Sequence, residues 1–132
     1  MHDLLCRSEV ARNLEQLLQQ KCGDRVWSFD FSHPMLRIFS VPIVDPPGVR
    51  LPNGDIIRFG KVGKDYVSGE CFHLSYEKAL DCAIQSLMVL IGKLRMKEIT
   101  EKKNYTWGDE RRRRHYIALF NEGLDMRKEL KK

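Results

Sequence analysis

The sequence predicts an α+β fold in which an N-terminal helix precedes an antiparallel β-meander of four or five strands and two long C-terminal helices. Two observations support this order. The spacing of apolar residues is helical near the N-terminus, alternating in the middle and helical again over the last part of the chain. An Asn-Gly pair also stands between two apolar runs of the middle region, which is a strong local signal for a hairpin.

The first elements are expected to be a helix and two strands. Apolar residues recur at helical spacing over residues 8–20, and Gly23 is placed to end the helix. Strict alternation of aromatic and polar residues predicts a strand over 26–31. The apolar run 36–44 predicts a second strand, and Pro42 indicates that it lies at an edge or ends in a bulge.

Hairpin signals continue the sheet. Asn53-Gly54 is expected at the centre of a turn, because Asn and Gly tolerate the positive φ that a tight hairpin turn needs. A second turn at 63–65 joins strands expected over 56–62 and 66–73. These strands complete the meander.

The last part of the chain predicts two long helices. Ser75 can cap a helix whose apolar residues keep helical spacing over 79–94. A final helix is expected to begin near Thr106 or Asp109 and to carry an apolar stripe over 116–124.

The whole chain is expected to form a single domain, 1–132, because its length and its 42% hydrophobic content suit one core. No apolar stretch reaches the roughly 20 residues that span a bilayer, and the N-terminus lacks a signal-peptide pattern. Four scattered cysteines without metal-ligand or C-x-x-C spacing predict reduced and mostly buried thiols. We therefore expect a cytoplasmic protein that uses no membrane, metal or cofactor.

The net charge of +5 is concentrated in one region. Between Lys93 and Arg114 there are nine basic and four acidic residues, a surplus equal to that of the whole chain. Such a local positive field attracts the phosphates of nucleic acids, nucleotides or lipids. A solvated helix surface has the same composition, so charge alone leaves both interpretations open.

Familiar catalytic fingerprints are absent from the sequence, including the P-loop, dinucleotide-binding, zinc-protease and nucleophile-elbow patterns. Gly60, Gly63 and Gly69 stand at expected strand ends and are predicted to form turns. The four histidines have no sequence neighbour that suggests a base paired with a nucleophile, although such a triad assembles in space. We predict no catalytic residue, and a binding protein rather than an enzyme.

Segment 104–116 is the most informative part of the sequence. Its four successive arginines sweep most of the way round a helix, so they cannot all face one ligand. Arg111 shares a face with Arg114 and His115, where two guanidinium groups could grip the oxygens of one pyrophosphate. Arg113 instead heads the apolar stripe of Ile117 and Phe120, and it is expected to be half-buried where α-helix and sheet, or two protein molecules, pack together.

Aromatic residues near the arginines are candidate platforms for a base. Tyr105 and Trp107 precede the arginines, and Phe72 stands at the junction between the sheet and the first long helix. Core packing is the other role open to each of them. Asn104 opens the segment and is included among the candidate ligand-binding residues.

The size of the chain, its element order and its run of arginines ahead of His115-Tyr116-Ile117 resemble the phage anti-Thoeris sponge proteins of the first-described type. Proteins of that family bind a cyclic ADP-ribose-like immune signal without degrading it. The resemblance implies that this protein sequesters a small cyclic nucleotide in the cytoplasm of a bacterial host cell and so counters anti-phage immunity. It also implies a dimer or hexamer, and the extensive apolar stripes of the two long helices independently predict a homo-oligomer.

The resemblance also assigns roles to residues. Two of the four arginines would contact the ligand phosphates, and Phe72 would pack against the base. Family members can carry a second pocket for cyclic oligonucleotides, for which Arg58 and Arg95 are the candidates here. The full set of candidate ligand-binding residues is Arg58, Phe72, Arg95, Asn104, Trp107, Arg111, Arg112, Arg113, Arg114 and His115.

Two other functions fit the same basic charge. A double-stranded-RNA-binding domain would explain a helix, strands and a helix, but it places a lysine cluster at the start of the helix after the sheet. Here that position offers Lys78 beside the acidic Glu77. An inhibitor that presents the arginine helix to an acidic protein surface is the third interpretation. Nucleic acid and acidic proteins are therefore the alternative partners.

Overall fold

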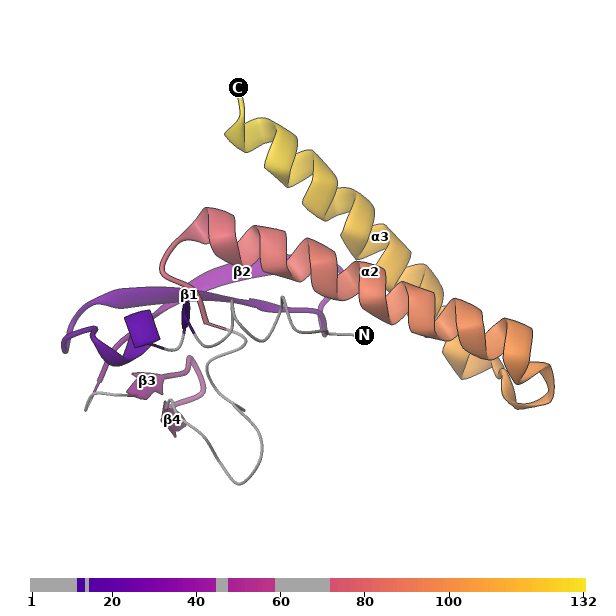
Figure 1. Ribbon diagram of the computed structural model, residues 1–132, viewed down its shortest axis with the longest axis horizontal. Helices are drawn as coiled ribbons and strands as arrows, with labels where there is room; N and C mark the ends of the chain where they lie inside the picture. The colour runs from indigo at the N-terminus through magenta and orange to yellow at the C-terminus, as the bar shows by residue number, and fades with distance from the viewer. Residues whose placement is uncertain (1–11, 14, 45–47, 59–71) are drawn as a thin grey trace. The chain divides into compact units, whose positions relative to one another are not determined.

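The α+β class is confirmed by a computed structural model that describes residues 12–13, 15–44, 48–58 and 72–132 (Figure 1). A short helix covers residues 12–13 and 15–18 near the N-terminus. The elements that follow are β1 (Arg25–Asp30), β2 (Arg37–Pro42), β3 (Gly48–Arg50), β4 (Ile56–Arg58), α2 (Tyr76–Thr100), a 3₁₀ turn (Lys102–Asn104) and α3 (Trp107–Leu130).

The strands form two small antiparallel sheets, β1 with β2 and β3 with β4. An isolated bridge between Ile43 and Val49 links the end of the first hairpin to β3, and a second bridge joins Trp27 to His73. In the part of the chain that the structure describes, the strands of the predicted meander therefore form two separate sheets. The expected turn at 63–65 and most of the strands around it lie outside the described residues.

The hairpin predicted at Asn53-Gly54 is present. In its register Gly48 faces Arg58, and Arg50 faces Ile56. Gly54 has a φ of 94°, a conformation that glycine adopts without strain. Gly54 therefore supplies the positive φ that was expected of this turn.

The chain divides into two compact units. That the whole chain forms a single domain stays a prediction. The first unit comprises residues 1–29 and 38–79, and the second residues 30–37 and 80–132. Buried residues from the short helix, the strands and the segment before α2 form the core of the first unit: Leu17, Val26, Val41, Ile43, Val49 and Phe72.

The second unit consists of most of α2, all of α3 and residues 30–37, which are the loop between β1 and β2 with the strand residue at each end of it. Contacts between Lys97 and Asp109 near one end, and between Asp81 and Arg127 near the other, show that the two helices run antiparallel. Leu87 and Leu119 are fully buried. Among the described helices, none is both long and apolar enough to cross a membrane.

Helix caps explain where the long helices begin. The Ser75 hydroxyl accepts a hydrogen bond from the Lys78 backbone N–H at 3.2 Å, which confirms the predicted cap of α2. Thr106 caps α3, and its hydroxyl accepts from the Asp109 N–H while the Asp109 carboxylate accepts from the Thr106 N–H. This reciprocal capping box fixes the start of the arginine helix.

Gly123 marks the closest packing in the second unit. A Cβ at this position would lie 2.9 Å from Ile84 Cγ1 and 3.2 Å from Leu36 Cδ2. Gly123→Ala should therefore lower the free energy of unfolding by about 1–2 kcal/mol, even after the gain in helix propensity. Gly92→Ala is the control, because nothing lies within 4 Å of its added methyl group; it should raise stability by about 0.5–1 kcal/mol in the same denaturant titration.

Candidate functional site

Asp109 is the buried charge around which the start of α3 is built. Its side chain is 2% exposed, accepts hydrogen bonds from Lys97 Nζ at 2.9 Å and from the Thr106 N–H at 3.0 Å, and is also bound by Arg112. The bond from Lys97 holds the pKa of Asp109 well below its usual range, and those from Thr106 and Arg112 lower it further. Asp109 is therefore an ionised carboxylate that ties α2 to α3.

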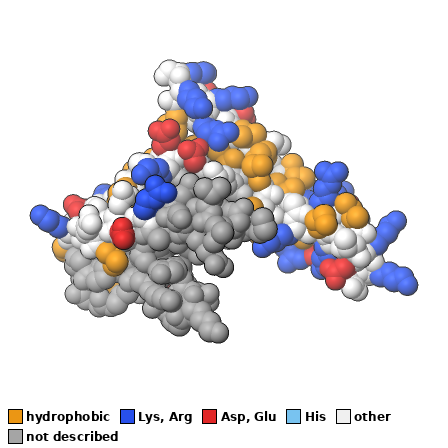
Figure 2. Space-filling model, in the orientation of Figure 1, with side chains coloured by type: hydrophobic (Ala, Val, Ile, Leu, Met, Phe, Trp, Pro, Cys, Tyr) orange, Lys and Arg blue, Asp and Glu red, His pale blue; other side chains and the backbone are white. Residues whose placement is uncertain are grey.

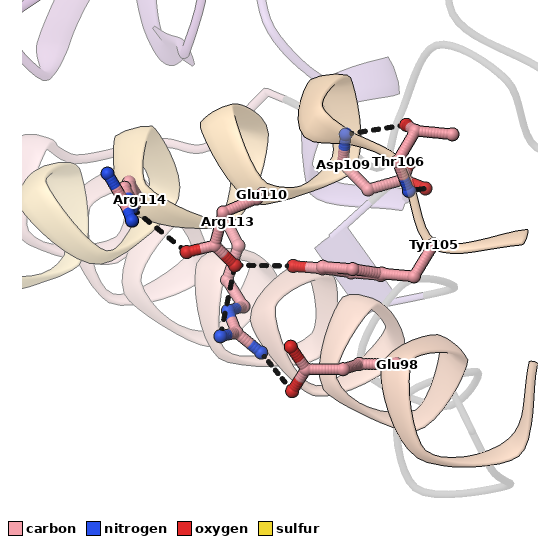
Figure 3. A network of polar contacts seen from close by, with 7 residues as sticks. All are labelled: Glu98, Tyr105, Thr106, Asp109, Glu110, Arg113 and Arg114. Carbon is pink, nitrogen blue, oxygen red and sulfur yellow. Dashed lines mark hydrogen bonds and ion pairs between the residues drawn. The ribbon is translucent and has the colours of Figure 1, made fainter. Parts of the chain in front are cut away.

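Glu110 and Glu98 form ion pairs with Arg113 and Arg114 (Figure 3). Arg113 lies 3.0 Å from Glu98 Oε1 and 3.1 Å from Glu110 Oε1, while Arg114 Nε lies 2.9 Å from Glu110 Oε2. The Tyr105 hydroxyl donates to Glu110 at 2.8 Å and is the main cause of the lowered pKa of Glu110. The hydrogen bond to Glu98 raises the pKa of Arg113. The Arg113 side chain is 22% exposed, as expected, but it lies between α2 and α3 and not at the expected contact with the sheet or with another protein molecule.

Arg111 differs from the three arginines that follow it. Its side chain is exposed, and within the described part of the chain it takes part in no hydrogen bond or ion pair. The anion-gripping face predicted for Arg111 and Arg114 stays a prediction: Arg114 is 68% exposed, but it is bound by Glu110 and its guanidinium lies over the Trp107 ring, 5.7 Å from the centroid. Arg111 is thus the arginine of the run that makes no ion pair with any residue that the structure describes.

Arg111 stands at an open groove of about 530 Å³ between the loop after β1 and the exposed side of α3. The groove lies entirely within the second unit. It combines cationic, anionic and aromatic side chains: Asp30, Phe31, Ser32, Arg111, Arg112, His115 and Tyr116.

Contacts between the loop and α3 hold the groove together. His115 Nε2 lies 2.6 Å from the Phe31 carbonyl oxygen, which can only accept a hydrogen bond. The rings of Phe31 and Tyr116 meet edge to face, with centroids 6.5 Å apart. His115 was a predicted ligand residue, and in the structure its Nε2 instead fastens the loop to α3.

Asp30 forms the acidic wall of the groove. Its Oδ1 accepts from both the backbone N–H and the hydroxyl of Ser32, at 2.9 and 2.8 Å, and its Oδ2 lies 3.2 Å from His33 Nε2. The hydrogen bonds from Ser32 are the largest cause of its lowered pKa. The groove therefore places a fixed carboxylate on the loop side and guanidinium groups on the helix side.

The remaining candidate residues do not join the groove. Phe72 is buried in the core of the first unit, so it offers no open face for a base. Trp107 is 70% exposed at the start of α3, and Asn104 is exposed in the 3₁₀ turn. Arg58 lies in β4 of the first unit and Arg95 on the exposed surface of α2 in the second.

Basic side chains gather where α2 passes to α3, with hydrophobic side chains exposed among them (Figure 2). Within the described ranges, no three His, Cys, Asp or Glu side chains come close enough together to hold a metal ion.

Cys22 is exposed, contrary to the expectation of mostly buried thiols, and Cys82 is half-buried. Cys6 and Cys71 lie outside the described residues.

Sequence reasoning missed four residues of the groove: Asp30, Phe31, Ser32 and Tyr116. A local signal existed for the turn at residues 30–32. An Asp at the end of a strand often accepts a hydrogen bond from the backbone N–H two residues on, which here is that of Ser32. Comparisons with known proteins add no further candidate: no family model, no curated protein and no solved structure matches the chain.

Proposed function

We propose that the protein binds and sequesters a small phosphate-bearing cyclic nucleotide, of the cyclic ADP-ribose kind, in the groove between residues 30–32 and α3. The observation that carries the proposal is that Arg111, which has no acidic partner among the described residues, stands beside a fixed carboxylate and two aromatic rings. In an infected bacterial cell, such binding would lower the free concentration of an immune signal, as the family resemblance implies.

Each part of such a ligand has a complementary group. Arg111 can place two N–H groups on phosphate oxygens, and Arg112 keeps further donors because its side chain is 59% exposed despite its bond to Asp109. The carboxylate of Asp30 can accept from a ribose hydroxyl. The Phe31 and Tyr116 rings can pack against a base.

The surroundings of Asp30 and His115 favour binding over catalysis. Asp30 has a lowered pKa, which makes it a weak base near neutral pH. His115 Nε2 already contacts the Phe31 carbonyl, so this nitrogen is occupied by a structural hydrogen bond. Neither group is placed to activate a nucleophile, which supports sequestration rather than turnover.

Binding to nucleic acid or to an acidic protein surface requires a strongly cationic helix. The ion pairs of α3 argue against both alternatives. Arg112, Arg113 and Arg114 are each paired with Asp109, Glu98 or Glu110. A large polyanion or an acidic protein surface would have to compete with these pairs. The internal neutralisation favours a small ligand that needs only one or two guanidinium groups.

A binding and recovery experiment tests the proposal. The protein is incubated with cyclic ADP-ribose isomers, isolated by gel filtration and denatured, and the released small molecules are identified by mass spectrometry. We expect stoichiometric recovery of intact ligand. A cleaved product would instead identify an enzyme, and long nucleic acid on the purified protein would favour the RNA-binding alternative. Arg111→Ala, which should retain no ligand, is the control.

A further inference from the structure

The groove of the proposed ligand site holds few positive charges. Its lining includes two guanidinium groups, those of Arg111 and Arg112, and one carboxylate, that of Asp30. Two guanidinium groups match the two negative charges of the pyrophosphate in a cyclic ADP-ribose. No other lysine or arginine of the described part of the chain lines the groove, so a third phosphate would find no such partner there.

Asp30 is held so that its carboxylate stays at the groove. Its Oδ1 accepts both hydrogen bonds from Ser32, and its Oδ2 lies 3.2 Å from His33 Nε2. The bonds from Ser32 are the largest cause of the lowered pKa of Asp30, so the group is ionised at neutral pH. The side chain is 35% exposed, and a carboxylate oxygen can accept more than one hydrogen bond, so Oδ2 can still accept from a ligand.

The positive groups near Asp30 do not turn this wall of the groove into a phosphate site. His33 and Arg37 each lower the pKa of Asp30 by a smaller electrostatic effect than the bonds from Ser32. Arg37 Nη1 lies 3.0 Å from His33 Nε2, and neither residue lines the groove. The charge that a ligand meets on this wall is therefore that of Asp30.

A ligand held by the arginines comes within reach of Asp30. His115 lies about one helical turn after Arg111, and its Nε2 is 2.6 Å from the carbonyl oxygen of Phe31, the residue next to Asp30. The volume of the groove, about 530 Å³, falls in the usual range of small-molecule sites, roughly 300–1,000 Å³. A pyrophosphate against Arg111 therefore leaves room for its attached ribose at the opposite wall, where Asp30 stands.

We infer that Asp30 is a specificity-determining residue that admits cyclic nucleotides with free ribose hydroxyls and excludes those in which such a hydroxyl is phosphorylated. This inference rests on the proposed function, which places the phosphates against Arg111 and Arg112. A free hydroxyl donates a hydrogen bond to the carboxylate, whereas a phosphate monoester carries a charge of about −1.5 to −2 near neutral pH and is repelled by it. An acidic residue recognises a ribose 2′-hydroxyl in the same way in dinucleotide-binding folds, in which an arginine accommodates a 2′-phosphate.

Titration calorimetry with pairs of cyclic ADP-ribose isomers that differ only in a phosphate on one ribose hydroxyl tests the inference; cyclic ADP-ribose and cyclic ADP-ribose 2′-phosphate are one such pair. We expect the parent protein to bind the unphosphorylated member at least about tenfold more tightly. Asp30→Asn keeps an oxygen that can accept from Ser32 but removes the charge, so it should reduce this preference to about threefold or less. Asp125→Asn makes the same change at an exposed position about 21 Å along α3 from Arg111, and it should leave the preference unchanged.

Salt supplies a second measurement on the parent protein alone. Because added salt screens repulsion across an open groove, the preference should shrink between about 0.05 and 0.5 M NaCl. Thermal melts verify that each variant is folded. Equal binding of both members of a pair, a preference that salt does not change, or an Asp30→Asn variant that keeps the parent's preference would overturn the inference and leave the proposed function standing. A parent protein that binds none of the ligands would contradict both.

Discussion

Arg111→Ala is expected to weaken binding of the cyclic nucleotide by about a hundredfold or more without lowering the melting temperature. Two charge-assisted hydrogen bonds to phosphate would be lost, each worth roughly 1.5–3 kcal/mol. The folded protein loses no described contact, because Arg111 makes no ion pair within the described residues. Removing one of several adjacent positive charges also relieves repulsion along α3. Titration calorimetry measures the first effect and a thermal melt the second.

Arg114→Ala is the matched control on the same helix. Arg114 is bound by Glu110 and lies over Trp107, and it does not line the groove. We therefore expect its removal to change affinity by no more than a few-fold. An equal loss of affinity in both variants would support a binding face shared by Arg111 and Arg114, and normal binding by Arg111→Ala would exclude the groove as the site.

Which of the four arginines form ion pairs follows in part from the residues three and four positions before them. Acidic residues three or four positions before an arginine lie next to it on a helix. Arg112, Arg113 and Arg114 each have such a residue in Asp109 or Glu110, whereas the positions before Arg111 hold Trp107 and Gly108. Applied to the amino-acid sequence alone, this rule singles out Arg111.

The other wall of the groove could not be found in this way. The contact between His115 and Phe31 joins residues 84 positions apart, and no periodicity or local motif connects them. Phe72 illustrates a related limit, because a large aromatic residue suits a core and a stacking platform equally. Local patterns determine the helices, their caps and the hairpin turn, while the groove depends on how the loop after β1 packs against α3.

Asp109→Asn is expected to cause a large loss of stability, with a fall in melting temperature of about 5–10 °C at neutral pH. Asparagine keeps the size of the side chain and can still accept the Thr106 N–H, so the capping geometry is largely preserved. The negative charge is lost, however, and Lys97 and Arg112 then face each other without a counter-ion. The effect should therefore arise from the charge and not from the cap.

The pH dependence of unfolding separates this charge from a general helix defect. The folded-state pKa of Asp109 is lowered, so its contribution is present above the pKa of an unfolded aspartate, about 4, and is lost as the pH falls below that value. The parent protein should lose melting temperature steeply below about pH 4, with Glu110 adding to the slope because its pKa is lowered too. Asp109→Asn should show a flatter curve. Asp125→Asn, the same change at an exposed position of α3, should follow the parent curve. If Asp109→Asn also followed it, Asp109 would not be the charge that ties α2 to α3.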